Sequence, residues 1–163
     1  MLVEDSIEAH VPFDLVGQAI AADQGRWLAP LADAAQEVPD ELLIKAGLSA
    51  EEPHIGKQVR CDIGPARHRG AALVIPISWE ATGASAIFPR LDADLEIRPL
   101  SKEVTRLTLQ GGYNPPLGSA GRALDTLAFH HVAQASVHAF LSRLAEAFEQ
   151  KAQEASGPAG GNG

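Results

Sequence analysis

Several features that would point to a specific chemistry are missing from this sequence. Cys61 is the only cysteine among 163 residues, which excludes an internal disulfide bond and a cysteine-based metal cluster. Aromatic residues make up 5% of the chain, so we expect an interior lined mainly by aliphatic side chains. No apolar run approaches the roughly 20 residues of a transmembrane helix, and no hydrophobic leader segment opens the sequence. A cytoplasmic protein that does not insert into membranes is therefore expected.

Positive charge is also scarce. The chain has 13 Lys and Arg residues against 21 Asp and Glu residues, a formal net charge of -8. Binding to nucleic acid requires basic side chains that neutralise phosphates, and docking on anionic membranes requires a basic patch. The composition argues against both kinds of partner. Residues 67–69 (Arg-His-Arg) form the densest basic group, and we interpret them as a solvated hairpin tip rather than an anion site.

Motifs for catalysis and for cofactor binding are absent as well. The sequence contains neither a G-x-S-x-G nucleophile motif nor a phosphate-binding glycine loop. The six histidines lack the spacing of a metal site, since His131 and His138 are seven residues apart. Asp92 and Asp94 share the polar face of a predicted strand, and we interpret them as solvated. No catalytic residue, metal or cofactor is therefore predicted.

Alternation of polar and apolar residues predicts five strands. Residues 90–98 alternate without a break, as expected for a strand with one buried face. Short connections such as residues 100–103 favour antiparallel neighbours. Pro76 lies on the polar face of its strand, which favours a bulge or an edge position. The predicted strands are residues 2–11, 57–63, 70–81, 85–100 and 104–111.

Helical segments are predicted after the first strand and after the last strand in the sequence. Pro12 ends the first strand and a short helix opens at Phe13, followed by one or two short helices within residues 23–49. Residues 115–150 form a long amphipathic helix, because apolar side chains recur there every three or four residues. We expect this helix to cover one face of a curved antiparallel sheet. Its inward stripe consists of Thr126, His130, Ala133, Val137, Phe140, Leu141, Leu144 and Phe148.

A family resemblance is carried by residues 87–91, 95–100, 105–109, 112–118, Asp125, His130–His131 and Phe140–Leu141. In their order of elements they resemble the START-like superfamily of helix-grip proteins (SRPBCC), which includes the polyketide cyclase/dehydrase family. The resemblance implies an α+β fold, in which a curved antiparallel β-sheet wraps around a long C-terminal α-helix, with short helices after the first strand. It implies one domain over residues 1–150, and the Gly-rich residues 151–163 are predicted to be a disordered tail.

The resemblance also implies a deep apolar cavity between sheet and helix, and candidate ligand-binding residues are those predicted to face it. His130 either bonds a backbone carbonyl at the edge of the core or orients a ligand. Tyr113, the sole tyrosine, either contacts ligand or packs beneath the prolines that follow. Arg122 either binds a carboxylate or is solvated. The remaining candidates are Trp79, Leu107, Leu109, Thr126 and Val137.

Three functions are open on this basis. We favour the binding of a small hydrophobic molecule, such as a lipid, a sterol or a polyketide-like compound, without enzymatic activity. A polyketide cyclase or dehydratase is the first alternative, and it requires His130, Tyr113 and Arg122 to converge on one cavity. A protein-interaction module is the second alternative, and it requires a large exposed apolar patch. A homodimer formed through the edges of the sheet is also left open.

Overall fold

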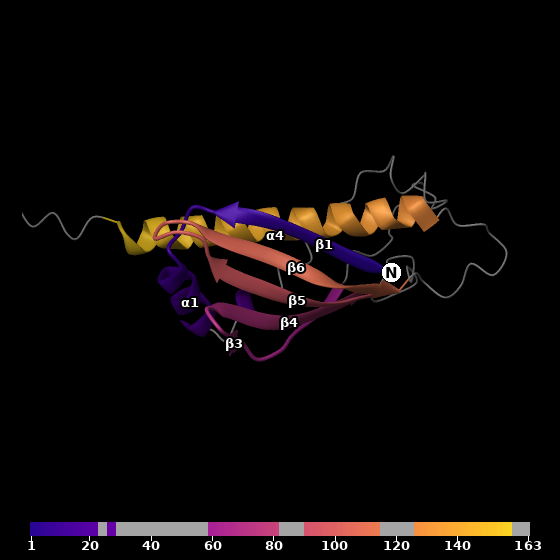
Figure 1. Ribbon diagram of the computed structural model, residues 1–163, viewed down its shortest axis with the longest axis horizontal. Helices are drawn as coiled ribbons and strands as arrows, with labels where there is room; N and C mark the ends of the chain where they lie inside the picture. The colour runs from indigo at the N-terminus through magenta and orange to yellow at the C-terminus, as the bar shows by residue number, and fades with distance from the viewer. Residues whose placement is uncertain (23–25, 29–58, 82–89, 115–125, 158–163) are drawn as a thin grey trace, which may run out of the picture.

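The computed structural model describes residues 1–22, 26–28, 59–81, 90–114 and 126–157. Within these ranges the chain forms a β-sheet, a long helix across one face and a short helix beside one end (Figure 1). Of the predicted helices within residues 23–49, only a 3-10 turn lies in the described part. The elements are β1 (Leu2–Ala9), α1 (Phe13–Ala22), η1 (Arg26–Leu28), β2 (Val59–Ile63), β3 (Arg67–Arg69), β4 (Ala72–Ala81), β5 (Arg90–Pro99), β6 (Thr105–Asn114) and α4 (Thr126–Ala155).

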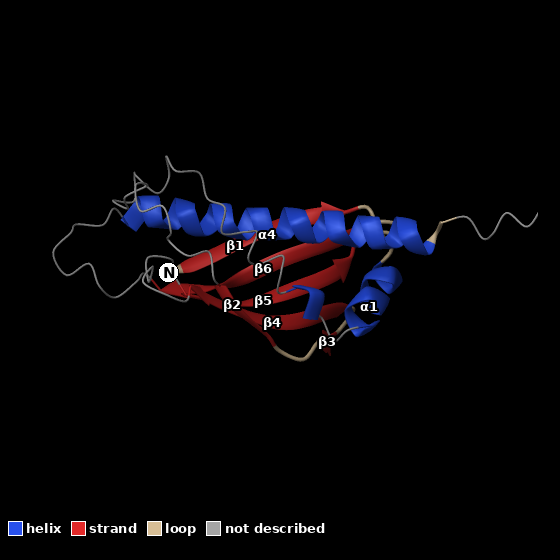
Figure 2. Cartoon of the chain, turned by 180° about the vertical axis from the view of Figure 1, so that it is seen from behind, coloured by secondary structure: helices blue, strands red, loops and turns tan. Residues whose placement is uncertain are grey.

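The sheet is antiparallel throughout. Its six strands follow the order β1-β6-β5-β4-β2, and the short strand β3 also pairs with β4. Consecutive strands β4, β5 and β6 are neighbours, as their short connections predict. α4 lies across one face of this sheet, and α1 lies beside the end near β3 and β4 (Figure 2). The predicted fold class, an α+β helix-grip arrangement, is confirmed.

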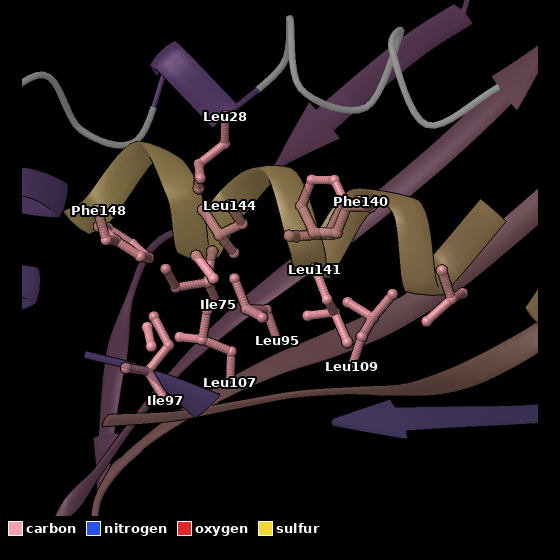
Figure 3. Close-up of a cluster of buried hydrophobic side chains, with 14 of the residues drawn as sticks. Leu28, Ile75, Leu95, Ile97, Leu107, Leu109, Phe140, Leu141, Leu144 and Phe148 are labelled. Atoms are coloured by element: carbon pink, nitrogen blue, oxygen red, sulfur yellow. The ribbon is translucent and has the colours of Figure 1, made fainter. Parts of the chain in front are cut away.

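The core lies between the sheet and α4. Leu95 in β5 pairs with Ile75 of β4 on one side and with Leu109 of β6 on the other, and all three side chains are buried. Because alternate residues of a strand point to the same face, this register places an aliphatic layer under α4 (Figure 3). Burying one large apolar side chain contributes about 1.5–3 kcal/mol. The predicted stripe on α4 is buried at Ala133, Val137, Phe140, Leu141, Leu144 and Phe148.

Residues 67–69 form a strand, so their interpretation as the hairpin tip was wrong. β3 pairs with β4, and the turn that joins them contains Gly70, whose φ of 61° suits glycine. Arg67 and Arg69 point to the face opposite α4, where their guanidinium groups lie 3.4 and 3.5 Å from Asp94 of β5. These ion pairs join β3 to β5 across β4 and favour the extended conformation of residues 67–69. The three β3 side chains are exposed, as predicted.

Pro76 lies at a bulge, as its sequence position suggests. β2 pairs with β4 as far as Ile63, and β3 resumes the pairing at Arg67. Residues 64–66 therefore lie opposite only two residues of β4. The N–H of Gly64 donates to the carbonyl of Pro76 over 2.8 Å, so the N–H that proline lacks would face this interruption. The bulge thus accommodates a proline inside a strand that has neighbours on both sides.

Two elements extend beyond their predicted ends. α4 continues past the predicted end at Gln150 to Ala155, because Ala152 still packs against the core and residues 151–155 are good helix formers. The start of the predicted tail is therefore helical, whereas residues 158–163 lie outside the described part. β6 continues past Gly111 to Asn114. None of the helices within the described ranges is both long and apolar enough to cross a membrane.

Candidate binding pocket

Two of the polar residues predicted to bind ligand meet near the start of α4. Tyr113 of β6 is buried, with the residue 1% exposed, and His130 of α4 is half-buried. The Tyr113 hydroxyl lies 3.2 Å from Nδ1 of His130, and it also contacts the sulfur of Met1. The N-terminal ammonium group donates to the Tyr113 carbonyl over 3.1 Å. Tyr113 and His130 therefore bond each other, and their role in ligand binding stays a prediction.

Burial raises the pKa of Tyr113 above its ordinary value of 10.0. As pH rises above 10, the phenol loses its proton in the unfolded chain before it does so in the folded chain. The stability that Tyr113 contributes is therefore complete below pH 10 and is lost as pH rises through the folded-state pKa. Because this is the only tyrosine, tyrosinate absorbance reports on it alone. We expect a titration midpoint above 10 in the native protein and of about 10 in urea. Equal midpoints would show that the hydroxyl is solvated in the folded state.

The apolar candidates pack within the core. The ring centroids of Trp79 and Phe140 are 5.4 Å apart, at an interplanar angle of 59°, a favourable aromatic contact between β4 and α4. Arg122 lies outside the described residues, and Thr126 is described only as the first residue of α4. Four candidates are at most 4% exposed: Trp79, Leu107, Leu109 and Val137. None of the four is among the described residues that line a pocket beside α1.

A pocket of about 930 Å³ lies between α1 and the strands β2, β3 and β4. We call it the α1 pocket. Its floor includes Ile20 of α1 together with Leu73 and Ile75 of β4, which also belong to the core cluster. The bulge at residues 64–66 supplies another wall. The described residues that line the pocket are Phe13, Asp14, Gly17, Gln18, Ile20, Ala21, Ile63, Gly64, Pro65, Ala66, His68, Leu73 and Ile75.

Gly17 opens the α1 pocket on its helical side. A glycine inside a helix costs about 1 kcal/mol relative to alanine. Apart from its chain neighbours and the backbone of its own helix, no heavy atom lies within 4 Å of the position that a Cβ atom would take at Gly17, and its φ is not in the left-handed region. Neither close packing nor backbone conformation therefore requires a glycine here. The absence of a side chain at Gly17 leaves space in the pocket.

Three polar side chains border the pocket. Asp14 and Gln18 lie one turn apart on α1, so they project from the same side of the helix. His68 comes from β3, where it points to the α1 side because its two arginine neighbours point to the opposite face. Within the described part of the chain, these three side chains make no hydrogen bond or ion pair. An apolar floor bordered by unengaged polar groups is typical of a small-molecule site.

The opposite face of the sheet has a different character. It carries an open groove of about 630 Å³ that includes Asp92 and Asp94. Asp92 lies 3.2 Å from the guanidinium of Arg90, and Asp94 lies 3.4 Å from that of Arg67, so both carboxylates form exposed ion pairs, consistent with their interpretation as solvated. No three His, Cys, Asp or Glu side chains in the described ranges are grouped to hold a metal ion. The α1 pocket is therefore the candidate functional site.

Comparison with known proteins finds similarity in fold alone. No family model and no curated protein matches the chain. Similar solved structures include the Zhui aromatase/cyclase of a Streptomyces strain, with a TM-score of 0.41 and 15% identity over 99% of this chain and 98% of that one. A hypothetical protein from Helicobacter pylori has a TM-score of 0.41 and 12% identity, over 88% and 87% of the two chains. A conserved protein from Geobacillus kaustophilus has a TM-score of 0.45 and 13% identity, over 92% and 96%.

One of these similar structures is an aromatase/cyclase. At such TM-scores, none of the three carries an argument about what this chain binds. Its function has to be argued from the α1 pocket.

Proposed function

We propose that this protein binds a small, predominantly apolar molecule in the α1 pocket. The observation that carries the proposal is a volume of about 930 Å³ over a floor of core aliphatic residues, bordered by a few polar groups. Sites for small molecules have this size and this kind of lining. Lipids, sterols and polyketide-like compounds, the classes implied by the family resemblance, have suitable chemistry. The proposed site adjoins α1, whereas the sequence prediction placed it beneath α4.

Thermal unfolding in the presence of fatty alcohols, fatty acids, sterols, flavonoids and aromatic polyketides tests this proposal. A ligand at about 100 times its dissociation constant adds about 2.7 kcal/mol to the free energy of unfolding, which raises Tm by several degrees for a domain of this size. We expect a concentration-dependent rise in Tm for at least one of these classes. No rise for any class would contradict the proposal.

A pair of matched variants locates the binding. Ala66 is an exposed residue of the bulge that lines the α1 pocket, and Ala71 is an exposed residue of the turn between β3 and β4 that does not. Ala66→Trp should remove the ligand-induced rise in Tm, because the indole fills the mouth of the pocket, whereas Ala71→Trp should preserve it. Loss of the rise in both variants, or in neither, would place the ligand elsewhere.

Cyclase or dehydratase activity is a second candidate. The observation that favours it is that an imidazole, His68, and a carboxylate, Asp14, border the same pocket, since such chemistry needs a positioned acid or base. Turnover of whichever ligand raises Tm would distinguish an enzyme from a binding protein. A cytoplasmic location and a homodimer formed through a sheet edge remain predictions from the sequence.

A further inference from the structure

We infer that the α1 pocket selects an uncharged or cationic molecule whose polar end donates a hydrogen bond, and discriminates against the matching carboxylate. The inference rests on the proposed binding function and specifies the ligand class. It follows from the polar groups that border the pocket and from the direction in which nearby basic side chains point.

The formal charge on the described lining of the pocket is negative. Asp14 is the only Asp, Glu, Lys or Arg among the described lining residues. The basic residues nearest in sequence to the lining, Arg67 and Arg69, point to the other face of the sheet and are engaged by Asp94 and Glu96 of β5. An anionic ligand would therefore meet a carboxylate without a compensating cation from the described lining. The net charge of -8 acts in the same direction.

The hydrogen-bonding capacity of the lining favours a donor on the ligand. An ionised Asp14 can only accept hydrogen bonds, whereas Gln18 and a neutral His68 can both donate and accept. A hydroxyl, phenol or ammonium group can donate to Asp14, but a carboxylate cannot. Because none of these three side chains has a partner in the described part of the chain, a ligand that meets them breaks no bond to a described residue.

The expected discrimination is moderate. A unit charge at contact distance in water changes a binding constant by about fivefold. Exchanging a ligand charge that Asp14 attracts for one that it repels therefore changes the binding constant by about 25-fold. Asp14 lies in the first turn of α1, where the positive end of the helix dipole offsets about half of a unit charge. We therefore expect about a fivefold preference for an ammonium over a carboxylate on the same apolar chain, with the alcohol between them.

Displacement of a neutral fluorophore, N-phenyl-1-naphthylamine, measures this preference directly. The competitors are decylamine, 1-decanol and decanoate below their micellar concentrations, at about pH 8, where the amine is protonated and the acid ionised. In the parent protein decylammonium should displace the probe at the lowest concentration and decanoate at the highest. In Asp14→Lys the order should reverse. Asp92→Lys, which makes the same change in net charge on the opposite face, should keep the parent order.

The outcomes separate this inference from the proposed function. Displacement of the probe with equal potency by all three competitors, or an unchanged order in Asp14→Lys, overturns the charge selection while leaving a binding pocket in place. Reversal in both lysine variants also overturns it, because the effect would then come from the net charge. A probe that does not bind at all overturns the proposed function and the inference together.

Discussion

Replacing Gly17 with leucine should stabilise this protein and weaken probe binding in the α1 pocket by about tenfold or more. The stabilisation follows from helix propensity, since leucine is favoured over glycine by nearly 1 kcal/mol inside a helix and no heavy atom obstructs a Cβ atom at this position. The loss of affinity follows because the new side chain occupies space that the ligand needs, and overpacking costs about 1–3 kcal/mol. Urea unfolding and titration with N-phenyl-1-naphthylamine measure the two effects separately.

Gly17→Ala provides a graded control. It relieves most of the helical cost of glycine, about 1 kcal/mol, while adding a single methyl group to a pocket of about 930 Å³. We expect it to be stabilised with little change in affinity. Opposite signs for stability and binding in Gly17→Leu are hard to produce by general damage to the fold. Parent-like binding by the leucine variant would show that the ligand does not use this space.

Gly111→Ala should destabilise the protein by about 3 kcal/mol or more, a large part of the 5–15 kcal/mol that holds a typical domain folded. Gly111 of β6 pairs with Ala93 of β5. A Cβ atom at Gly111 would come within 2.3 Å of the carbonyl oxygen of Asp92, 2.4 Å of the Cβ of Ala93 and 2.5 Å of its Cα. Two of these are backbone atoms, so the strands would have to separate in the middle of the sheet.

Gly112 supplies the matched control, because it is the next residue on the same strand. A Cβ atom there would meet only the carbonyl oxygen of Met1, at 3.8 Å, an ordinary contact distance. Gly112→Ala should therefore change the free energy of unfolding by less than about 1 kcal/mol. Urea unfolding of both variants gives the comparison. If both variants lost a similar amount of unfolding free energy, the close approach of β5 and β6 would not be the reason for a glycine at Gly111.

The arrangement of the core could be read from local patterns. Alternation over residues 90–98 identified the buried face of β5, where Leu91, Leu95 and Ile97 are buried under α4. The helical stripe from Ala133 to Phe148 was likewise correct, because a residue's direction from a helix or strand depends only on its spacing. β3 was missed, since a strand of three residues is too short for alternation to show and its ion pairs come from a distant strand.

The polar groups were harder to place. Tyr113 and His130 were each identified as candidates, but only the folded chain shows that they bond each other. The α1 pocket was missed altogether. Its one local signal was a glycine inside a short helix, between Asp14 and Gln18, and that pattern becomes meaningful only when the opposing wall is known to leave space.

The sequence by itself therefore determined the elements other than β3, the faces that β5 and α4 bury and the helix-grip order of the elements. These properties follow from spacing along one segment. Only the tertiary structure shows that Leu107, Leu109 and Val137 are buried in the core and that a pocket lies beside α1. The physical reason is that periodicity shows which side chains turn inward, whereas an open space depends on how well the volumes of surfaces far apart in the sequence match.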